Sequence, residues 1–462
     1  MATERKIVFW TILSAMQLIY SCSSQTLYSD SDTCSEQDEI KTLKDQTAFL
    51  KQLVSRLNQS KKDQDIKTEM LEKELNSVKE TLLILMAPDH VAFHVVANSS
   101  SGPGVIIFDH VISNIERGYD INSGIFSAPT TGFYVFSWSI ETYGQLTEAA
   151  LLVNGFEMGT TKSDQASSYY DTTTSFAVLN LTNKDKVWVR VKSGRAEAMH
   201  TMFSGWMISK TDCTAFYASL SHEVNGSRII FNNETLDTDD AYSTTTGKFV
   251  APRSGLYVFM MSGLIYGNYD FVCKFVFSNG NSMPVIWVDS SSGNYDSSSY
   301  MTFAWMNSGE SVYIDAKRMI ATSTFAGWLM IEDTSVSKST FPAFLAHISG
   351  SSNSTPIVYN TAHGSYHHGY STSTGVFTAD RDGLYLFLYN TEAYRRVTVT
   401  ALRVNGVELF ETISDARRTN HDDTCAVTVI RLSSNDRVSI GVKSGIVDGW
   451  ESLFFGILLF DI

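Results

Sequence analysis

Apolar side chains recur every three to four residues between Ile40 and Leu85, and mainly Lys, Glu, Asp and Gln fill the positions between them. One seam position of this seven-residue repeat holds Ile40, Thr47, Val54, Lys61, Thr68, Leu75 and Leu82, and the other holds Leu43, Leu50, Leu57, Gln64, Leu71, Val78 and Leu85. Ten of these fourteen positions are apolar. The pattern predicts an α-helical coiled coil within residues 35–87, through which the chain self-associates.

Three polar residues, Lys61, Gln64 and Thr68, interrupt the seam. Polar residues at such positions more often fix the register or the number of strands than bind a ligand. We expect the helix to end at Ala87-Pro88, because a proline disfavours helical geometry at the residue before it.

Beyond residue 88 the pattern changes to short alternating stretches separated by Gly, Ser, Thr and Asn, which is typical of β-strands. One block of thirteen residues occurs three times, at 124–136, 247–259 and 375–387, and places a glycine turn before a strand with alternating aromatic residues. An Asn-Gly hairpin turn also recurs, at Asn154-Gly155, Asn279-Gly280 and Asn405-Gly406. These repeats predict three antiparallel β-sandwich domains, at 89–209, 213–332 and 341–462.

The composition supports a mainly β protein, because aromatic residues make up 12% of the chain and charged residues only 18%. Asp and Glu (49) outnumber Lys and Arg (35), which gives a net charge of −14. The chain has no excess of cations to neutralise a phosphate backbone, so we expect no binding to nucleic acid.

Residues 1–24 have the layout of a cleaved secretory signal peptide: Arg5 and Lys6, an apolar run from Ile7 to Tyr20, and small residues up to Ser24. The alternative is an uncleaved membrane anchor, but the apolar run is shorter than the ~20 residues that span a bilayer. We therefore expect a secreted, extracellular protein with no membrane span after signal removal.

Glycosylation acceptors of the form Asn-x-Ser/Thr fit a secretory route, although such triplets also arise by chance. They lie at Asn58, Asn98, Asn180, Asn225, Asn233 and Asn353. The cysteines beyond the signal, Cys34, Cys213, Cys273 and Cys425, are too few and too scattered for a disulfide scaffold or a zinc site. Cys34 precedes the helical segment, where it forms either an interchain disulfide or an unpaired thiol.

The aromatic and glycine residues of the three copies follow one spaced pattern. The first copy has Phe108, Asn114, Tyr119, Phe126, Gly132, Tyr134 and Phe136; the second has Phe231, Asp237, Tyr242, Phe249, Gly255, Tyr257 and Phe259; the third has Tyr359, Ser365, Tyr370, Phe377, Gly383, Tyr385 and Phe387. This pattern resembles the C1q domain family of the complement globular head. The copies depart from it at Trp138, at Met261, and at Tyr359 and Ser365.

The resemblance implies a fold: three tandem ten-strand jelly-roll sandwiches, of the type shared with tumour necrosis factor cytokines, after an N-terminal α-helical coiled coil. Domains of this family normally form trimers, with both ends of each domain on one side. About six residues join the first two domains, reaching ~20 Å when extended, whereas stacking would require a climb of about 40 Å along a domain. We therefore expect the copies to pack side by side as one pseudo-threefold head, with stacked homotrimers as the alternative.

No nucleophile elbow, paired-histidine helix, phosphate loop or cysteine-pair metal motif occurs in the sequence. We expect no enzymatic activity, no catalytic residues, no metal site and no cofactor, although calcium is compatible with the sequence. The densest histidine cluster, His363, His367 and His368, is either a metal or pH-sensing site or an ordinary solvated turn.

A stronger candidate is an aspartate at equivalent places in the three copies, preceded by an aromatic side chain. The pairs are Tyr170-Asp171, Tyr295-Asp296 and His421-Asp422. Aromatic faces beside carboxylates suit sugars, which stack and form hydrogen bonds; the alternative is that the aspartates shape hairpin turns. The third copy adds arginines, Arg395, Arg396, Arg417 and Arg418, which either bind acidic sugars or phosphates or protect a strand edge from aggregation.

The resemblance to lectin-like C1q-domain proteins of invertebrate innate immunity implies a secreted, multivalent pattern-recognition protein. Its expected ligands are carbohydrates of microbial surfaces or lipopolysaccharide, contacted by the residues around Asp171, Asp296 and Asp422 and by Arg417 and Arg418. The alternatives are an extracellular scaffold or matrix-assembly protein and a cytokine-like receptor ligand.

Overall fold

A computed structural model describes residues 36–86, 90–164, 169–267, 269–280, 286–290, 294–333, 341–417 and 421–462. The chain divides into two compact units, Met1–Leu83 and Ile84–Ile462. The first contains most of one long helix, and the second contains all the strands.

Helix α2 (Glu36–Met86) has 51 residues and ends immediately before Ala87-Pro88, as the proline predicts. The ion pair Lys73–Glu69, at 3.1 Å, lies on its exposed surface. Among the described residues, no helix combines the length and the apolar character needed to cross a membrane.

The first domain consists of two antiparallel sheets, ordered β3-β1-β11-β6-β9 and β4-β5-β10-β7-β8. Its strands are β1 (Ala92–Val96), β2 (Gly104–Val105), β3 (His110–Ile115), β4 (Tyr119–Asp120), β5 (Ile125–Ser127), β6 (Gly132–Tyr143), β7 (Leu146–Val153), β8 (Phe156–Asp164), β9 (Tyr170–Leu181), β10 (Lys186–Ser193) and β11 (Met202–Ser209).

The second and third domains repeat this topology, with the orders β14-β12-β23-β17-β20 and β15-β16-β21-β18-β19, then β25-β24-β33-β28-β31 and β26-β27-β32-β29-β30. The second has β12 (Ala215–Ser219), β13 (Val224–Asn225), β14 (Asn233–Asp237), β15 (Tyr242–Ser243), β16 (Lys248–Val250), β17 (Gly255–Tyr266), β18 (Tyr269–Phe277), β19 (Ile286–Ser290), β20 (Tyr295–Met306), β21 (Ser311–Ala316), β22 (Arg318–Met319) and β23 (Thr324–Glu332). The third has β24 (Ala343–His347), β25 (Thr361–His367), β26 (Tyr370–Ser371), β27 (Val376–Thr378), β28 (Gly383–Tyr394), β29 (Val397–Val404), β30 (Val407–Asp415), β31 (His421–Leu432), β32 (Arg437–Ser444) and β33 (Asp448–Asp461). The predicted mainly β fold of three tandem sandwiches is confirmed.

The repeated aromatic residues form the core of each sandwich. In the first domain, Phe93 stacks on Phe126 with ring centroids 5.0 Å apart and meets Phe203 edge-on at 4.9 Å. Gly205 lies against this cluster, where an added Cβ would approach Phe93 to 2.5 Å and Phe136 to 2.8 Å. A glycine is required two residues after the closing phenylalanine because the packed rings leave no space for a side chain.

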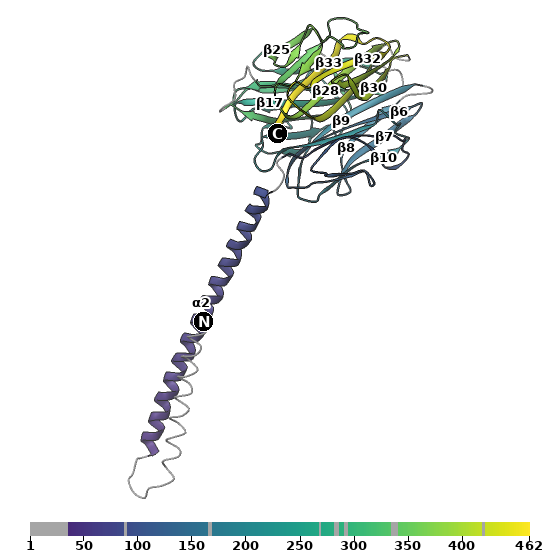
Figure 1. Ribbon diagram of the computed structural model, residues 1–462. Coiled ribbons are helices and arrows are strands. Elements are labelled where there is room, and N and C mark those ends of the chain that lie inside the picture. Colours follow the sequence, from purple (N-terminus) through teal and green to yellow (C-terminus); the bar gives the residue numbers. More distant parts are fainter. Residues whose placement is uncertain are drawn as a thin grey trace. The chain divides into compact units, whose positions relative to one another are not determined.

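The three domains pack side by side within the second unit (Figure 1). Strands β9, β20 and β31, one from each domain, contact one another. Thr174 Oγ1 of the first domain donates a hydrogen bond to Cys425 O of the third at 2.7 Å. Ser262 Oγ of the second domain donates in turn to Thr174 O at 2.8 Å. Packing of Phe303 against Phe455, with centroids 5.7 Å apart, joins the second and third domains. The arrangement agrees with the side-by-side packing expected from the short linkers.

We predict that a chain beginning at Asp89 is a monomer, because each domain already buries its central strand against the other two domains of the same chain. Light scattering on the purified protein measures this directly. A mass of three chains would show that the domains prefer partners from other molecules and would contradict the arrangement.

Candidate functional site

One aspartate from each domain reaches the central axis of the head. Asp171, Asp296 and Asp422 are each the second residue of a twelve-residue strand, β9, β20 or β31. One carboxylate oxygen of each lies within 4.8 Å of the others, and all three side chains are buried. We call these residues the axial aspartates. The sequence analysis expected these aspartates either to contact a sugar or to shape hairpin turns; instead, each belongs to a strand that the packing of the three domains buries.

Burial dominates the electrostatics of the axial aspartates, because charged carboxylates lose their hydration there. It raises the pKa of Asp171 to about 7. Burial, followed by repulsion from the neighbouring carboxylates, raises the pKa values of Asp296 and Asp422 well above the usual range. Backbone N–H groups oppose this effect only in part: the N–H of Asp164 donates to Asp171 Oδ2 at 2.6 Å, and the N–H of Ser297 donates to Asp296 Oδ1 at 2.7 Å. The cluster therefore holds protons at neutral pH.

A fourth buried carboxyl, Asp423, extends the acidic region into the contact between the second and third domains. Ser298 Oγ donates to Asp423 Oδ2 at 2.8 Å, and Asn390 Nδ2 donates to the same atom at 2.9 Å. Burial raises the pKa of Asp423 to about 7. The protonation of this group and that of the axial aspartates are therefore linked to the contacts that hold the domains together.

The donor set of the axial aspartates fits a hard cation, because oxygen ligands are those that Ca²⁺ and Mg²⁺ prefer. Asp171, Asp296 and Asp422 would hold such an ion, and its charge would replace the shared protons. The three residues provide fewer ligands than the 6–8 that Ca²⁺ takes, so water or backbone oxygens would complete its shell.

Aromatic pairs flank the axial aspartates in all three domains. Tyr170, Tyr295 and His421 each contact Tyr143, Tyr266 or Tyr394 across the strand pair, with ring centroids 4.7, 4.7 and 5.0 Å apart and ring planes tilted by 45°, 45° and 46°. Tyr143 is 41% exposed and Tyr266 is 44% exposed. The sequence predicted an aromatic residue beside each aspartate, but the stacking partners come from the preceding strands β6, β17 and β28.

Cationic side chains lie over these rings. Lys162 Nζ is 4.8 Å from the ring centroid of Tyr295, and the guanidinium carbon of Arg395 is 5.0 Å from that of Tyr394. The guanidinium carbon of Arg417 is likewise 5.0 Å from the Tyr169 centroid. We call the set the aromatic rim: Tyr143, Tyr169, Tyr170, Tyr266, Tyr295, Tyr394 and His421 with Lys162, Arg395 and Arg417.

Arg417 is fixed in the aromatic rim by a fully buried carboxylate. Its Nε donates to Asp415 Oδ1 at 2.7 Å and its Nη2 donates to Asp415 Oδ2 at 2.5 Å. The same Asp415 Oδ2 accepts the backbone N–H of Tyr170 from the first domain at 3.1 Å. Asp164 accepts the N–H of Tyr295 in the same way, at 3.1 Å. The strand register puts Ser290 of the second domain at the place that Asp164 and Asp415 occupy in the first and third domains. The parts of the aromatic rim that the three domains contribute, which we call its sectors, are therefore chemically unequal.

An ion-pair chain between the first and third domains was not predicted from the sequence. His200 Nδ1 lies 2.8 Å from Glu141 Oε1, and His200 Nε2 lies 3.4 Å from Glu411 Oε1. Burial acts to lower the pKa of His200, but its bonds to the two glutamates outweigh burial and raise the pKa to about 9. The sequence did contain one indication that the first and third domains differ here from the second. Glu141 and Glu392 occupy equivalent places in β6 and β28, whereas Leu264 occupies that place in β17.

The remaining candidates are placed as follows. The predicted cluster of His363, His367 and His368 does not form among the described side chains: His363 Nε2 lies 2.5 Å from His347 Nδ1, and His368 Nε2 lies 3.5 Å from Asp380. The bulged pairing of β24 with β25 brings His363 to His347 instead. The side chain of His367 and residue Arg418 lie outside the described parts of the chain.

The glycosylation acceptors lie on the surface, whereas the described cysteines are buried. All six acceptors are exposed, namely Asn58, Asn98, Asn180, Asn225, Asn233 and Asn353. Cys213, Cys273 and Cys425 are buried and unbridged. Cys34 lies outside the described residues.

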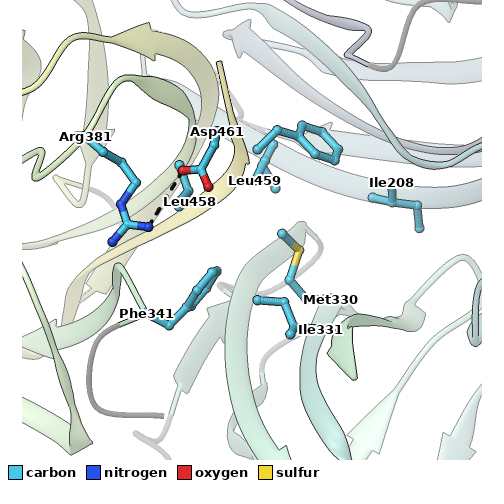
Figure 2. A pocket seen from close by; sticks show the side chains of 9 residues that line it. Ile208, Met330, Ile331, Phe341, Arg381, Leu458, Leu459 and Asp461 are labelled. Carbon is cyan, nitrogen blue, oxygen red and sulfur yellow. Dashed lines mark ion pairs between the residues drawn. The ribbon is translucent and has the colours of Figure 1, made fainter. Parts of the chain in front are cut away.

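A separate hollow of about 310 Å³ lies at the opposite ends of the central strands (Figure 2). It is lined by Ile208, Met330, Ile331, Phe341, Leu458, Leu459 and Phe460, with the ion pair Arg381–Asp461 (3.9 Å) on one side. None of the predicted site residues lines it, and its mostly apolar wall has few groups that could form hydrogen bonds with a sugar.

We predict that the head becomes less stable as pH rises from 5 to 8. The unfolded aspartates titrate near 3.8, whereas Asp171 and Asp423 titrate at about 7 in the folded protein. The folded state therefore binds more protons in this interval, and each extra proton costs about 1.4 kcal/mol of stability per pH unit. Thermal unfolding of the 89–462 chain measures the trend.

Replacing the axial aspartates together (Asp171→Asn, Asp296→Asn and Asp422→Asn) is expected to flatten the pH profile and to raise Tm at pH 8. Asp240→Asn, at an exposed site, is the matched control and should leave the profile unchanged. A Tm of the unchanged protein that increases between pH 5 and pH 8 would contradict the prediction.

The sequence of this chain has recognisable relatives. The family model described as "C1q domain" matches residues 92–208, 215–345 and 340–459. The chain is 32% identical to Complement C1q tumor necrosis factor-related protein 3 of Homo sapiens over 120 residues, which are 25% of this chain and 48% of that protein. It is 30% identical to Collagen alpha-1(X) chain of Mus musculus over 110 residues, 22% of this chain and 16% of that protein.

A solved structure of the Globular Domain of Zebrafish Complement 1qA protein matches 26% of this chain and 99% of that chain, with 20% identity and a TM-score of 0.24. The chain spans less than half the length of the two curated relatives above. The family model, by contrast, covers more than half of the present chain. This protein therefore belongs to the C1q domain family and contains three tandem copies of the domain.

Proposed function

We propose that this protein is a secreted, non-enzymatic recognition protein that binds microbial surface glycans or lipopolysaccharide through the aromatic rim. The observation that carries the proposal is the repeated pairing of partly exposed aromatic rings with cationic side chains around the axial aspartates. Aromatic faces stack on the apolar faces of sugars, and their hydroxyl groups provide hydrogen bonds.

The cationic side chains favour acidic groups on the ligand. Arg395 is exposed and lies over Tyr394, and a guanidinium group can bind a carboxylate or phosphate through paired hydrogen bonds. Arg417 uses its Nε and Nη2 on Asp415, and this ion pair orients it beside Tyr169. The axial aspartates are buried below these groups, so they act by placing the aromatic rim rather than by contacting a glycan.

Secretion accords with the signal-like start of the sequence and with exposed glycosylation acceptors. Self-association through α2 would bring several heads together. Because a shallow sugar site binds weakly, several such sites on one particle would increase the overall affinity without new contacts. The unequal sectors of the rim would contribute unequally to this binding.

Extracellular assembly is the second candidate function. It is favoured by the similarity of this chain to Collagen alpha-1(X) chain of Mus musculus and to Multimerin-1 of Homo sapiens. In that function the domains would connect protein chains to one another, and a glycan would not be needed.

We predict that the combined change Tyr143→Ser, Tyr266→Ser and Arg395→Ser reduces binding to whole bacteria and to a glycan array about tenfold or more, because each change removes an exposed stacking or charged group. The matched control is Phe156→Ser with Val407→Ser. These residues are 72% and 65% exposed and follow the Asn-Gly turns at the other ends of β7 and β29. Binding by the control should be unchanged.

Unaltered binding by the rim variant, with its Tm preserved, would place the glycan site elsewhere on the head. Absence of binding by the unchanged protein to every glycan and every bacterial surface would favour the assembly function.

A further inference from the structure

The first compact unit presents a row of apolar side chains that stay exposed among the residues that the structure describes. Six seam residues of α2 are between 43% and 55% exposed: Leu50, Val54, Leu57, Leu71, Leu75 and Val78. Burying such a row stabilises association by about 25 cal/mol per Å² of apolar surface. The row follows a seven-residue repeat, so its partner is another helix with the same repeat.

The identities of the seam residues specify the number of helices. One seam position, a, carries four β-branched residues, Ile40, Thr47, Val54 and Thr68, together with Lys61, Leu75 and Leu82. The other, d, carries five leucines, Leu43, Leu50, Leu57, Leu71 and Leu85, together with Gln64 and Val78, and no isoleucine. In parallel coiled coils, β-branched residues at a with leucine at d favour two strands, whereas isoleucine at d favours higher orders.

Lys61, at an a position, favours the same number. In a two-stranded coil a lysine at a can extend its stem along the partner helix and keep its ammonium group in water. In a coil of three or more helices, the Lys61 ammonium groups of all the helices would face one another inside a closed core. Each would lose its hydration there, at a large cost in free energy. Asn58 flanks the seam at an e position and is exposed, and flanking positions stay more accessible in a two-stranded coil than in larger bundles.

Charge complementarity fixes the orientation and register. In a parallel, in-register pair, each g residue faces the e residue five positions later on the partner helix. Lys67 at g then faces Glu72 at e, and the sequence places Glu74 at g against Lys79 at e. None of the g–e combinations from Gln46 to Met86 carries like charges. The charges therefore support this alignment on both sides of the seam.

We propose that α2 pairs, in parallel and in register, with α2 of a second copy of this chain, so that the assembled molecule has two heads and six C1q domains. The inference deepens the self-association on which the proposed function rests. In a head made of three separate chains, the stalk would need three helices. Here one chain supplies all three domains, which leaves the stalk free to take the number of helices that its own seam prefers.

The primary test is the mass of the secreted full-length protein, measured by light scattering under reducing conditions and corrected for attached glycan. One chain has a mass of 51.3 kDa before signal removal. A mass of two chains is expected; a mass of one or three chains would overturn the proposal. The measurement needs no ligand, so failure of glycan binding would leave its outcome unaffected.

Orientation is tested by Val54→Cys under oxidising conditions, in protein that also carries Cys34→Ser. The parallel, in-register pair brings the two introduced thiols together across the seam, so a covalent two-chain band should form in high yield. Absence of that band, with the two-chain mass retained, would overturn the proposed register.

The ionic contacts are tested by a charge exchange. Lys67→Glu places a glutamate opposite Glu72 on both sides of the pair and should weaken dimerisation about fivefold or more at low salt. The double variant Lys67→Glu with Glu72→Lys restores opposite charges and should recover the original affinity. Equal weakening in both variants, by analytical ultracentrifugation, would contradict the g–e pairing.

Discussion

The head depends on burying three unlike copies of one strand, β9, β20 and β31, against one another at a common axis. The apolar part of this contact has the usual hydrophobic origin, but the end occupied by the axial aspartates carries a cost, because three carboxylates lie within 4.8 Å of one another away from water. Shared protons or a bound cation reduce that cost. The packing of the domains and the charge of the axial aspartates therefore depend on each other.

The surrounding contacts show how the chain meets this constraint. Hydroxyl groups of Thr174 and Ser262 satisfy backbone carbonyls across the domain boundaries, and Ser298 donates to Asp423. Asp164 and Asp415 each accept a backbone N–H from a neighbouring domain. The polar network joins the domains, and it also places the paired tyrosines beside the cations of the aromatic rim. The candidate site is thus a consequence of the assembly, and a single isolated domain would have only one sector of it.

The helix, the three domains and their strands were predictable because heptads, Asn-Gly turns and alternating aromatic residues encode local geometry. The equivalence of Asp171, Asp296 and Asp422 was also visible, but their convergence was not. Sequence spacing placed them near hairpin loops, whereas their burial depends on how whole domains pack. The contact of His200 with Glu141 and Glu411 likewise joins side chains from two domains, and no pattern within one copy encodes it.

Covalent linkage of the three domains changes how the stability of the head depends on concentration. A trimer of separate chains falls apart when its concentration drops below its dissociation constant, but a head within one chain forms in an intramolecular reaction whose equilibrium does not depend on concentration. Because one polypeptide contains all three domains, their ratio and their order around the axis are also fixed when the chain is synthesised. Such a head remains intact at any dilution, and each of its three domains is free to diverge without mispairing.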